Sequence, residues 1–437
     1  MEWWLALSLM LGSLIILMLL GLPVAFSFLV ISFVFITVFM GIQVGPRQLV
    51  LSMFDSITKF SLTPIPFFVI MGEVLLHSGL GTRALNAMSN WVGAIPGRLS
   101  VITLLSGGLF ASLSGSTLAN TAMLGSLMVP EMRNRGYGKT VTVGPILASG
   151  ALAMVIPPSA LAVLLGSLAE VSIGKLLIAA LIPGFLLLTF FLLYTVIVCW
   201  IDPSQAPSYE VETVSFREKL ISTIRDLVPM GFVIFLVLGL IFLGVATPTE
   251  SAALGGVGSI ILAALYGGLT FDMIKKSMIG TLKVTVMILT IIAGSSAFSQ
   301  ILSFSGAGRA FVDMMIGLPL APIGIVVSMV VIVIVMGVFM DQVSIMMITT
   351  PIFMPVIHAL GFDPIWFLVL VLIALEIGQL TPPVGLALFV MKSVTPPDIS
   401  IKDIYKASLP YVAVEFIALA LLITVPAITL WLPYYIK

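Results

Sequence analysis

The sequence has 437 residues, of which 60% are hydrophobic and 9% are charged, and its mean hydropathy is +1.25. Soluble domains carry about 25% charged residues, so this composition excludes a soluble globular protein and predicts a polytopic membrane protein. The 19 basic and 19 acidic residues give a net charge of zero, which argues against a nucleic-acid partner. The single cysteine, Cys199, excludes an internal disulfide and a cysteine-based metal cluster.

The N-terminal part of the chain predicts scaffold helices. Residues 3–46 carry no charge, and Gly21-Leu22-Pro23 is a natural turn between two membrane spans, because about 20 apolar residues cross a bilayer. We therefore expect residues 1–60 to form N-terminal scaffold helices. Further apolar runs predict spans near residues 62–78, 176–201, 227–248, 250–271, 284–305 and 411–433.

The stretch FASLSGSTLANTAMLG, residues 110–125, places polar residues between two apolar flanks, 99–110 and 122–130. Flanks of this length are too short to span a bilayer, so we expect a re-entrant hairpin over about 99–130 with a polar tip. The alternative is small-residue helix packing, which does not account for Asn120. The candidate residues are Ser114 and Ser116 as metal ligands, and Gly115, Asn120 and Thr121 at the substrate.

A pair of prolines interrupts the next apolar run, which covers about residues 140–170. Proline lacks an N–H and clashes with the preceding turn, so Pro157-Pro158 frees carbonyl oxygens from helical hydrogen bonds. Such oxygens suit a small cation, and the N-terminus of the following half-helix suits an anion. A simple helix kink is the alternative. We expect metal-binding carbonyls at Gly150, Val155 and Pro157, and Ser159 at the substrate, in a first repeat over residues 61–201.

The middle of the chain, residues 202–283, is expected to contain a polar loop and connecting scaffold helices. The motif ATPTESAALG forms a tight link between two of the spans. There Thr247 or Thr249 can cap the next helix, and Glu250 can favour its N-terminus. We expect this structural role for Glu250, and interfacial or packing roles for Glu73, Glu170 and Glu415.

A second polar tip is expected in MGVFMDQVSIMMITTP, residues 336–351, within a hairpin over about 318–358. Asp341 is the only acid between Asp313 and Asp363. An ionised acid at the centre of a membrane helix costs roughly 2.5–3.5 kcal/mol, so Asp341 is expected to face a partner or a cation. The alternatives are a headgroup position or a lysine partner. The candidate residues are Gly337 and Asp341 as metal ligands, and Gln342 and Ser344 at the substrate.

A second pair of prolines, in IGQLTPPVG at residues 377–385, interrupts an apolar run over about 364–391. By the same argument, Gly378, Thr381 and Pro382 are expected to offer oxygen ligands to a cation. Glu376 directly precedes this motif. It is either a second intramembrane acid or a residue at a helix end, and the sequence leaves both possibilities open.

The two proline pairs belong to a long internal repeat. They lie 225 residues apart, and at the same offset MVPEMRNRGY (128–137) matches FMPVIHALGF (353–362). An even number of membrane crossings separates the two broken helices, so their directions are opposite and the repeat is inverted. In secondary transporters this symmetry places substrate and ion sites near the midplane of the membrane. The second repeat, with a C-terminal helix, is expected over residues 284–437.

These motifs are similar to those of the large membrane subunit of tripartite ATP-independent periplasmic (TRAP) transporters. The matching stretches, within residues 108–390, are SGSTLANTAMLG, VPEMRNRGY, IPPSALAVLLGSLAEVSIGKLLIAALIPG, ATPTESAALG, FMDQVSI and GQLTPPVG. The resemblance implies an all-α, elevator-type secondary transporter with two inverted repeats, each with a re-entrant hairpin and a broken helix. It implies sodium-driven import of a small organic acid, of the C4-dicarboxylate or sialic acid type, across the bacterial inner membrane.

The same resemblance implies two protein partners, a small four-helix membrane subunit and a soluble periplasmic binding protein that delivers the substrate. It places the first hairpin tip at Ser114, Gly115 and Ser116, the second at Asp341, and the cation-binding breaks at the two proline pairs. Asn120 stands where the family often has an acid. We expect one sodium site in each repeat and an anionic substrate between the two tips.

Three other classes of protein are alternatives. A stand-alone elevator-type sodium/dicarboxylate symporter would need no binding protein. A channel would need a continuous polar pore, whereas the polar residues here gather at two tips and two breaks. An intramembrane enzyme has no support, because the sequence contains no GxSxG or HExxH motif. We therefore expect a transporter and not an enzyme.

Overall fold

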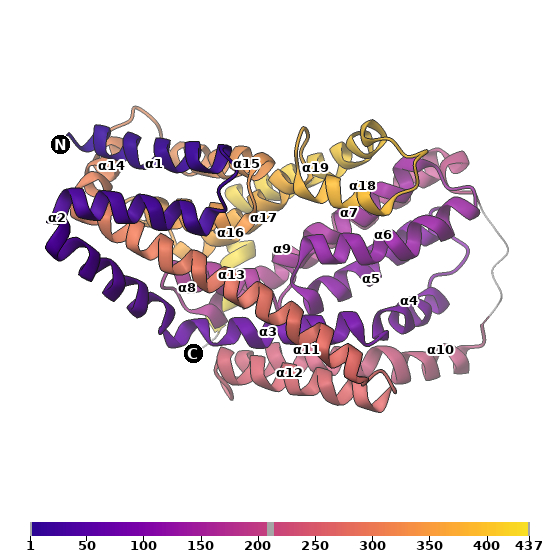
Figure 1. Cartoon of the computed structure of the whole chain (residues 1–437). Coiled ribbons are helices and arrows are strands. Elements are labelled where there is room, and N and C mark those ends of the chain that lie inside the picture. The colour runs from indigo at the N-terminus through magenta and orange to yellow at the C-terminus, as the bar shows by residue number, and fades with distance from the viewer. Residues whose placement is uncertain (1, 208–213, 436–437) are drawn as a thin grey trace.

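The computed structural model describes residues 2–207 and 214–435, and this part of the chain contains helices and turns but no strand. The prediction of an all-α fold is confirmed. By length and composition, nine of the described helices can cross a membrane, or ten when the bent pair α7 (Lys139–Val155) and α8 (Ala160–Leu168) is counted as one span. The chain is therefore a polytopic membrane protein (Figure 1).

The described part of the first half of the chain contains nine α-helices and two short 3-10 helices, η1 (Phe60–Leu62) and η2 (Pro203–Gln205). Besides α7 and α8, these helices are α1 (Trp3–Leu19), α2 (Val24–Ile57), α3 (Pro64–His77), α4 (Leu80–Trp91), α5 (Arg98–Ser114), α6 (Thr117–Asn134) and α9 (Ile173–Ile201).

In the second half, α10 (Phe216–Ser222) continues through a π-helical turn (Thr223–Leu227) into α11 (Val228–Phe242). The helices that follow are α12 (Pro248–Leu265), α13 (Phe271–Phe304), α14 (Ala307–Ile316), α15 (Pro322–Phe339), α16 (Gln342–Ala359), α17 (Pro364–Leu380), α18 (Leu386–Val394), α19 (Ile401–Thr424) and α20 (Ala427–Leu430).

The two halves repeat one order of helices. Each helix from α3 to α9 has a counterpart from α13 to α19, and in both sets a helical hairpin precedes a helix that is broken at a proline pair. The turns before α4 and α14 contain Gly79 and Gly306, whose φ angles are 74° and 73°. The hairpins α5–α6 and α15–α16 extend from opposite ends of the molecule toward its centre (Figure 1). The prediction of two inverted repeats is confirmed.

The arms of the first hairpin are longer than the apolar flanks at 99–110 and 122–130. Helices α5 and α6 have 17 and 18 residues, because the polar residues continue the helices instead of leaving them. The Ser112 hydroxyl, for example, donates a hydrogen bond at 2.8 Å to the Leu109 carbonyl of its own helix. A serine that is satisfied in this way does not interrupt the helix.

Helices α7 and α17 form the centre of the fold. Residues 141–155 and 366–380 are buried without interruption. A helix that is buried on every side must be surrounded by other elements. Here α5, α6, α9 and α19 pack around α7, and α15 and α19 pack around α17. Both helices end just before their proline pair. The first break is buried, whereas the second is partly exposed at Thr381 and Pro382.

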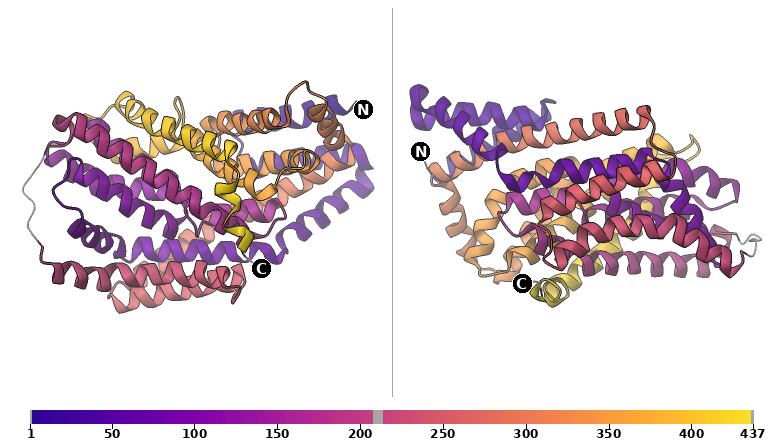
Figure 2. Two further views of the ribbon diagram at one scale, coloured as in Figure 1. Left: turned by 180° about the vertical axis from the view of Figure 1, so that it is seen from behind. Right: turned by 90° about the horizontal axis from the view of Figure 1, so that it is seen from below.

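A second layer of helices lies along one side of this centre. Helices α2 and α13 have 34 residues each and pack against each other, and α2 turns sharply at Gly41, whose φ is 77° (Figures 1 and 2). They expose large apolar side chains, including Phe54, Leu282 and Val286, as a lipid-facing surface requires. Helix α12 packs on α3 and α11. We call α2, α3, α12 and α13 the scaffold.

The predicted structural role of Glu250 is confirmed. Its carboxylate accepts a hydrogen bond at 2.8 Å from the Thr247 N–H, and the Thr247 hydroxyl accepts one at 3.3 Å from the Glu250 N–H. This reciprocal pair is a capping box that begins α12. The Glu415 side chain is fully buried in α19, which fits the packing role expected for it and not the interfacial one.

Candidate functional site

The tips of the two hairpins meet in one cavity. We call residues 114–116 the first tip and residues 340–342 the second tip. A cavity of about 290 Å³ is lined by all three residues of the first tip and by Asp341 and Gln342 of the second. Helices α3, α8 and α13 complete its wall. Sites for small molecules start at roughly 300 Å³, so this tip cavity can hold a small organic molecule.

The first tip lies directly on the first break, residues 156–159. Gly115 has a φ of 59°, and a Cβ on this residue would lie 3.1 Å from the Ala160 backbone nitrogen. Only glycine adopts this conformation at low cost and allows such a close approach. The tip backbone therefore lies on the N-terminus of α8. Ser116 and Ser159 cap α6 and α8 by accepting hydrogen bonds at 3.3 Å from the Ala119 and Ala162 N–H groups.

The second tip lies against the second break, residues 381–385, in the same way. The Gly385 N–H donates a hydrogen bond at 3.0 Å to the Val338 carbonyl. The Gln379 side-chain amide donates one at 3.4 Å to the Met340 carbonyl. Neither break is separated from its tip, so the carbonyl groups of both breaks lie beside the polar ends of the hairpins.

Two glycines allow the second hairpin to approach the second broken helix closely. Gly337 of α15 lies against Gly378 of α17, where a Cβ on Gly378 would lie 2.5 Å from the Gly337 Cα. The Gly378 carbonyl accepts a hydrogen bond from the Thr381 N–H at 3.2 Å. The Thr381 hydroxyl donates one to the Ile377 carbonyl at 2.5 Å, which leaves its oxygen free to act as an acceptor. Pro382 follows and is partly exposed.

Asp341 caps the second arm of its hairpin. One carboxylate oxygen accepts a hydrogen bond at 3.0 Å from the Ser344 N–H, and the other accepts one from the Ser344 hydroxyl. Ser344 is fully buried and supports Asp341 from within the protein. The Asp341 side chain itself lines the tip cavity and has no basic partner among the described residues. The alternative of a lysine partner for Asp341 therefore finds no support.

A buried hydrogen-bond network joins the two hairpins beside the cavity. Thr117 and Gln342, which begin α6 and α16, occupy equivalent positions in the repeat. The Thr117 hydroxyl donates to the Glu376 carboxylate at 2.6 Å, and the Gln342 amide donates to the same oxygen at 3.1 Å. Glu376 is fully buried in α17, so it is an intramembrane acid and not a residue at an exposed helix end.

Thr117 was not among the residues that the sequence singled out. A signal for it exists, because Thr117 and Gln342 are separated by the same 225 residues as the proline pairs. Glu376 has no acidic counterpart in the first repeat, where Ala151 stands at that offset. The network therefore joins Thr117 and Gln342, which occupy equivalent positions in the repeat, to Glu376, which has no acidic equivalent.

Asn120 lies outside the tip cavity. Its side-chain amide is fully buried and donates hydrogen bonds to the Gly107 carbonyl at 3.1 Å and the Ser149 carbonyl at 2.8 Å. These bonds join α5, α6 and α7. Thr121, one position further along α6, is also fully buried and packs its hydroxyl against Gly150 of α7.

Several oxygen atoms lie along α7 near the first break. The Thr121 hydroxyl is buried without a hydrogen-bond partner within the described residues. The Thr117 carbonyl lies beside Gly150, and the Val155 carbonyl lies beside Gly184 of α9. Val155 and Pro157 are buried. Neutral oxygens of this kind suit hard cations. Within residues 2–207 and 214–435, no group of three or more His, Cys, Asp or Glu residues could hold a metal ion, so a cation here would depend on hydroxyl and carbonyl ligands.

Comparison with known proteins assigns the chain to a family. Residues 11–428 match the family model described as the DctM component of the tripartite ATP-independent periplasmic transporter. The C4-dicarboxylate TRAP transporter large permease protein DctM of Pseudomonas aeruginosa is 32% identical over 89% of this chain and 90% of its own length. The sialic acid TRAP transporter large permease protein SiaM of Vibrio cholerae is 29% identical over 94% and 95%.

Two further comparisons concern chain length and fold. The isethionate TRAP transporter permease protein DctMQ of Oleidesulfovibrio alaskensis is 32% identical over 86% of this chain, which covers 59% of that longer protein. The crystal structure of the Alcanivorax borkumensis YdaH transporter has a similar fold, with a TM-score of 0.63 and 14% identity over 89% of both chains. The relatives are named as transporter permeases, and this chain is likewise a transporter subunit and not an enzyme. It belongs to the DctM family, the large membrane subunits of tripartite ATP-independent periplasmic transporters.

Proposed function

We propose that this chain is the transport subunit of a sodium-driven importer of small organic acids, of the C4-dicarboxylate or sialic acid type, in a bacterial inner membrane. The observation that carries the proposal is the meeting of both hairpin tips in one cavity, with each tip lying against the break of its own repeat. Helix N-termini at the tips offer N–H groups to an anion, and the breaks offer carbonyl oxygens to a cation.

Sodium has two tasks in this proposal. Asp341 faces the cavity, so an anionic substrate would meet a like charge unless a cation lay between them. One sodium ion beside each break reduces this repulsion. The ion also orders the tip that lies on that break, because its ligands come from both. The first site would use Ser114, Ser116, Gly150, Val155 and Pro157, and the second Gly337, Asp341, Gly378, Thr381 and Pro382.

The substrate would bind between Gly115 and Gln342, which face the tip cavity. Ser159, Ser344 and Thr121 are fully buried, and they would support the site from behind. Asn120 would hold α5, α6 and α7 together instead of touching substrate. A carboxylate is the group that the N-termini of α6 and α8, which are capped by the neutral residues Ser116 and Ser159, would bind.

We infer an elevator motion. The hairpins α5–α6 and α15–α16 with the broken helices α7–α8 and α17–α18 would form a transport unit that moves against the scaffold. The contact between the two bodies supports this division, because α13 of the scaffold lines the tip cavity with Val284, Met287 and Ile288. Apolar side chains there allow sliding without the loss of specific hydrogen bonds.

Two protein partners complete the system in this proposal, a small four-helix membrane subunit and a soluble periplasmic binding protein. The support comes from the family and from the longer relative named DctMQ, whose length exceeds that of this chain. The second candidate is a stand-alone sodium/dicarboxylate symporter with the same elevator fold. It would need neither partner.

Reconstitution into liposomes tests the proposal. The chain is inserted with its small membrane subunit, a panel of labelled organic acids is added with the binding protein, and uptake is measured under an inward sodium gradient. We expect saturable uptake of one class of carboxylate that stops when potassium replaces sodium. Uptake at the same rate without the binding protein would favour the stand-alone symporter. Uptake at the same rate in sodium and in potassium would overturn the proposal.

A further inference from the structure

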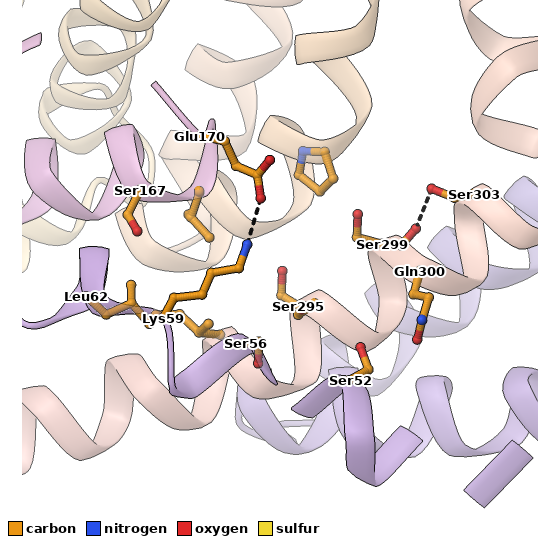
Figure 3. A pocket seen from close by; sticks show the side chains of 14 residues that line it. Ser52, Ser56, Lys59, Leu62, Ser167, Glu170, Ser295, Ser299, Gln300 and Ser303 are labelled. Carbon is orange, nitrogen blue, oxygen red and sulfur yellow. Dashed lines mark hydrogen bonds and ion pairs between the residues drawn. The ribbon is translucent and has the colours of Figure 1, made fainter. Parts of the chain in front are cut away.

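A second polar cavity lies next to the tip cavity and has no part in the function proposed above. Its volume is about 350 Å³, and it lies between α2 and α13 of the scaffold and α8 of the transport unit (Figure 3). Seven serines and one glutamine line it together with one lysine and one glutamate. Hydroxyl groups recur along α13 at Ser295, Ser299 and Ser303, one turn apart, so one face of this helix is polar inside a membrane protein.

The two charges in this cavity form an ion pair across the boundary between scaffold and transport unit. The Lys59 ammonium lies 2.6 Å from the Glu170 carboxylate, and the pair projects between the serines (Figure 3). The side chains are 48% and 73% exposed. Ion pairs with this much solvent contribute little to stability, so another carboxylate can replace that of Glu170 at small cost.

The backbone at Glu170 gives an independent sign of function. Its φ is 55°, and it is the one non-glycine residue with a positive φ in the described part of the chain. It occupies the turn after α8, where the Val171 N–H donates to the Gly166 carbonyl at 3.0 Å. Glycine is the usual residue at such a helix end. Strained residues of this kind concentrate at ligand sites and switch regions.

Two helices connect this cavity with the tip cavity. On α13, Ile288 lines the tip cavity and Ile292, one turn later, lines the serine-rich cavity. On α8, Leu161 lines the tip cavity and Ser167, two turns later, lines the second. A molecule that leaves the tips along these helices therefore reaches the serines next.

We propose that the serine-rich cavity is a second, transient binding site for the transported organic anion. Lys59 binds its carboxylate in place of Glu170, and the serine hydroxyls and Gln300 bind its other polar groups. Because the ion pair joins scaffold and transport unit, exchange of Glu170 for the anion also releases one contact between them. The inference rests on the proposed function for the identity of the anion, but not for the anion-binding property of the cavity.

Thiol labelling tests the cavity without any transported substrate. Ser299→Cys places a thiol in the cavity, and the single native cysteine, Cys199, is fully buried. The purified full chain is treated with anionic sulfonatoethyl methanethiosulfonate and cationic trimethylammonioethyl methanethiosulfonate. We expect the anionic reagent to react faster. Adding Lys59→Met should lower the ratio of anionic to cationic rates several-fold, and adding Glu170→Gln should raise it.

The opposite effects of these two variants cannot both arise from misfolding. Lys276→Met is the matched control, because Lys276 also lies in an exposed ion pair, at 2.7 Å from Asp272 on α13, and outside the cavity. It should leave the ratio unchanged. The proposal would be overturned if Lys59→Met left the ratio of anionic to cationic labelling rates unchanged. It would also be overturned if neither reagent reacted with the thiol at position 299.

Transport measurements separate this inference from the function on which it rests. In liposomes with the complete transporter, Lys59→Met should slow sodium-driven uptake several-fold and leave the sodium-dependent substrate affinity unchanged. Uptake by Lys59→Met at the wild-type rate would contradict the transit role of the cavity. Absence of sodium-driven uptake in the wild-type protein would contradict the proposed function instead, while the labelling ratio would still decide whether the cavity attracts anions.

Discussion

Asp341 has two roles that one substitution can separate. Its carboxylate caps α16 by accepting the Ser344 N–H, and its negative charge faces the tip cavity. Asparagine caps a helix about as well as aspartate does but carries no charge. The helix cap therefore contributes to the stability of the fold, and the negative charge contributes to the proposed sodium site.

Asp341→Asn should reduce sodium-driven uptake about ten-fold, which corresponds to about 1.4 kcal/mol of lost sodium binding, and leave the amount of folded protein in the membrane unchanged. Ser116→Ala should also depress uptake, because it removes a hydroxyl of the first tip. It should lower stability only by the value of one cap, about 0.5–2 kcal/mol. Uptake and thermal unfolding of the purified variants are the measurements. If sodium-dependent uptake survives both changes, the assignment of the sites is wrong.

Glu376 should contribute to stability through its acceptor oxygen. Glu376→Gln keeps an acceptor for Thr117 and Gln342. Glu376→Leu removes this acceptor and leaves only the 3.4 Å hydrogen bond from the Gln342 amide to the Thr117 hydroxyl, at a cost of about 1–3 kcal/mol. We expect the leucine variant to unfold at a clearly lower temperature than the glutamine variant. Thr117→Val, which removes one donor, should fall between them. Equal melting of the leucine and glutamine variants would show that the network contributes nothing.

Rare residues could be predicted from the sequence, and common ones could not. Asp341 stands out as the one acid in a long apolar run. The structure places it at the cavity. Asn120 was expected at the substrate, yet its amide bonds to carbonyls of α5 and α7. These partners depend on how three helices pack together, which no local pattern specifies. Thr117 is one of several hydroxyl residues at its tip, and composition alone gave no reason to prefer it.

At the level of helices, the crossing of α15 and α17 depends on two glycines. A methyl group on Gly378 would lie 2.5 Å from the Gly337 Cα, which is backbone and cannot rotate away. Gly378→Ala should therefore separate the two helices and lower the free energy of unfolding by about 1–3 kcal/mol. Gly12→Ala in α1, where no atom lies within 4 Å of the new methyl group, is the control.

The control should be neutral or stabilising by up to about 1 kcal/mol, because alanine favours helix more than glycine does. Thermal unfolding in detergent measures both changes. A Gly378→Ala protein that is as stable as the Gly12→Ala protein would contradict the close crossing of α15 and α17.

The breaks of the helices followed from the sequence, but the lengths of the helices did not. Two consecutive prolines in an apolar run predicted either a break or a kink, and α7 and α17 end before their proline pairs, as the prediction of a break requires. The arms of the first hairpin were expected to end where polar residues begin. They continue because serine can return its hydrogen bond to the preceding turn, as Ser112 does. A polar residue therefore does not by itself mark the end of a helix.

For the whole molecule, the proposed elevator motion requires the transport unit to slide along the scaffold during each transport cycle. The Ser61 and Ser167 hydroxyl oxygens lie 2.8 Å apart, one in η1 beside the scaffold and one in α8. In a Cys199→Ser background, Ser61→Cys with Ser167→Cys should form a disulfide on oxidation and block uptake, and reduction should restore it. The uptake rate of each single variant should be the same under oxidising and reducing conditions. Full uptake by the cross-linked protein would exclude this relative motion.

The whole architecture was the most predictable part, because the repeat carries information that no single segment has. The shared 225-residue offset and the count of crossings were enough to give two inverted halves. The contacts between the two halves could not be predicted from the sequence. That both tips line one cavity, and that Thr117 bonds to both Glu376 and Gln342, depends on contacts between residues more than 200 positions apart.

The most direct test of the account is the binding of the transported acid to the purified protein at increasing sodium concentration. If oxygens at both breaks bind sodium beside the anion, affinity should rise with sodium along a curve with a Hill coefficient above 1 and up to about 2, the number of sites. Potassium should not substitute. An affinity that is the same in sodium and potassium would contradict the account.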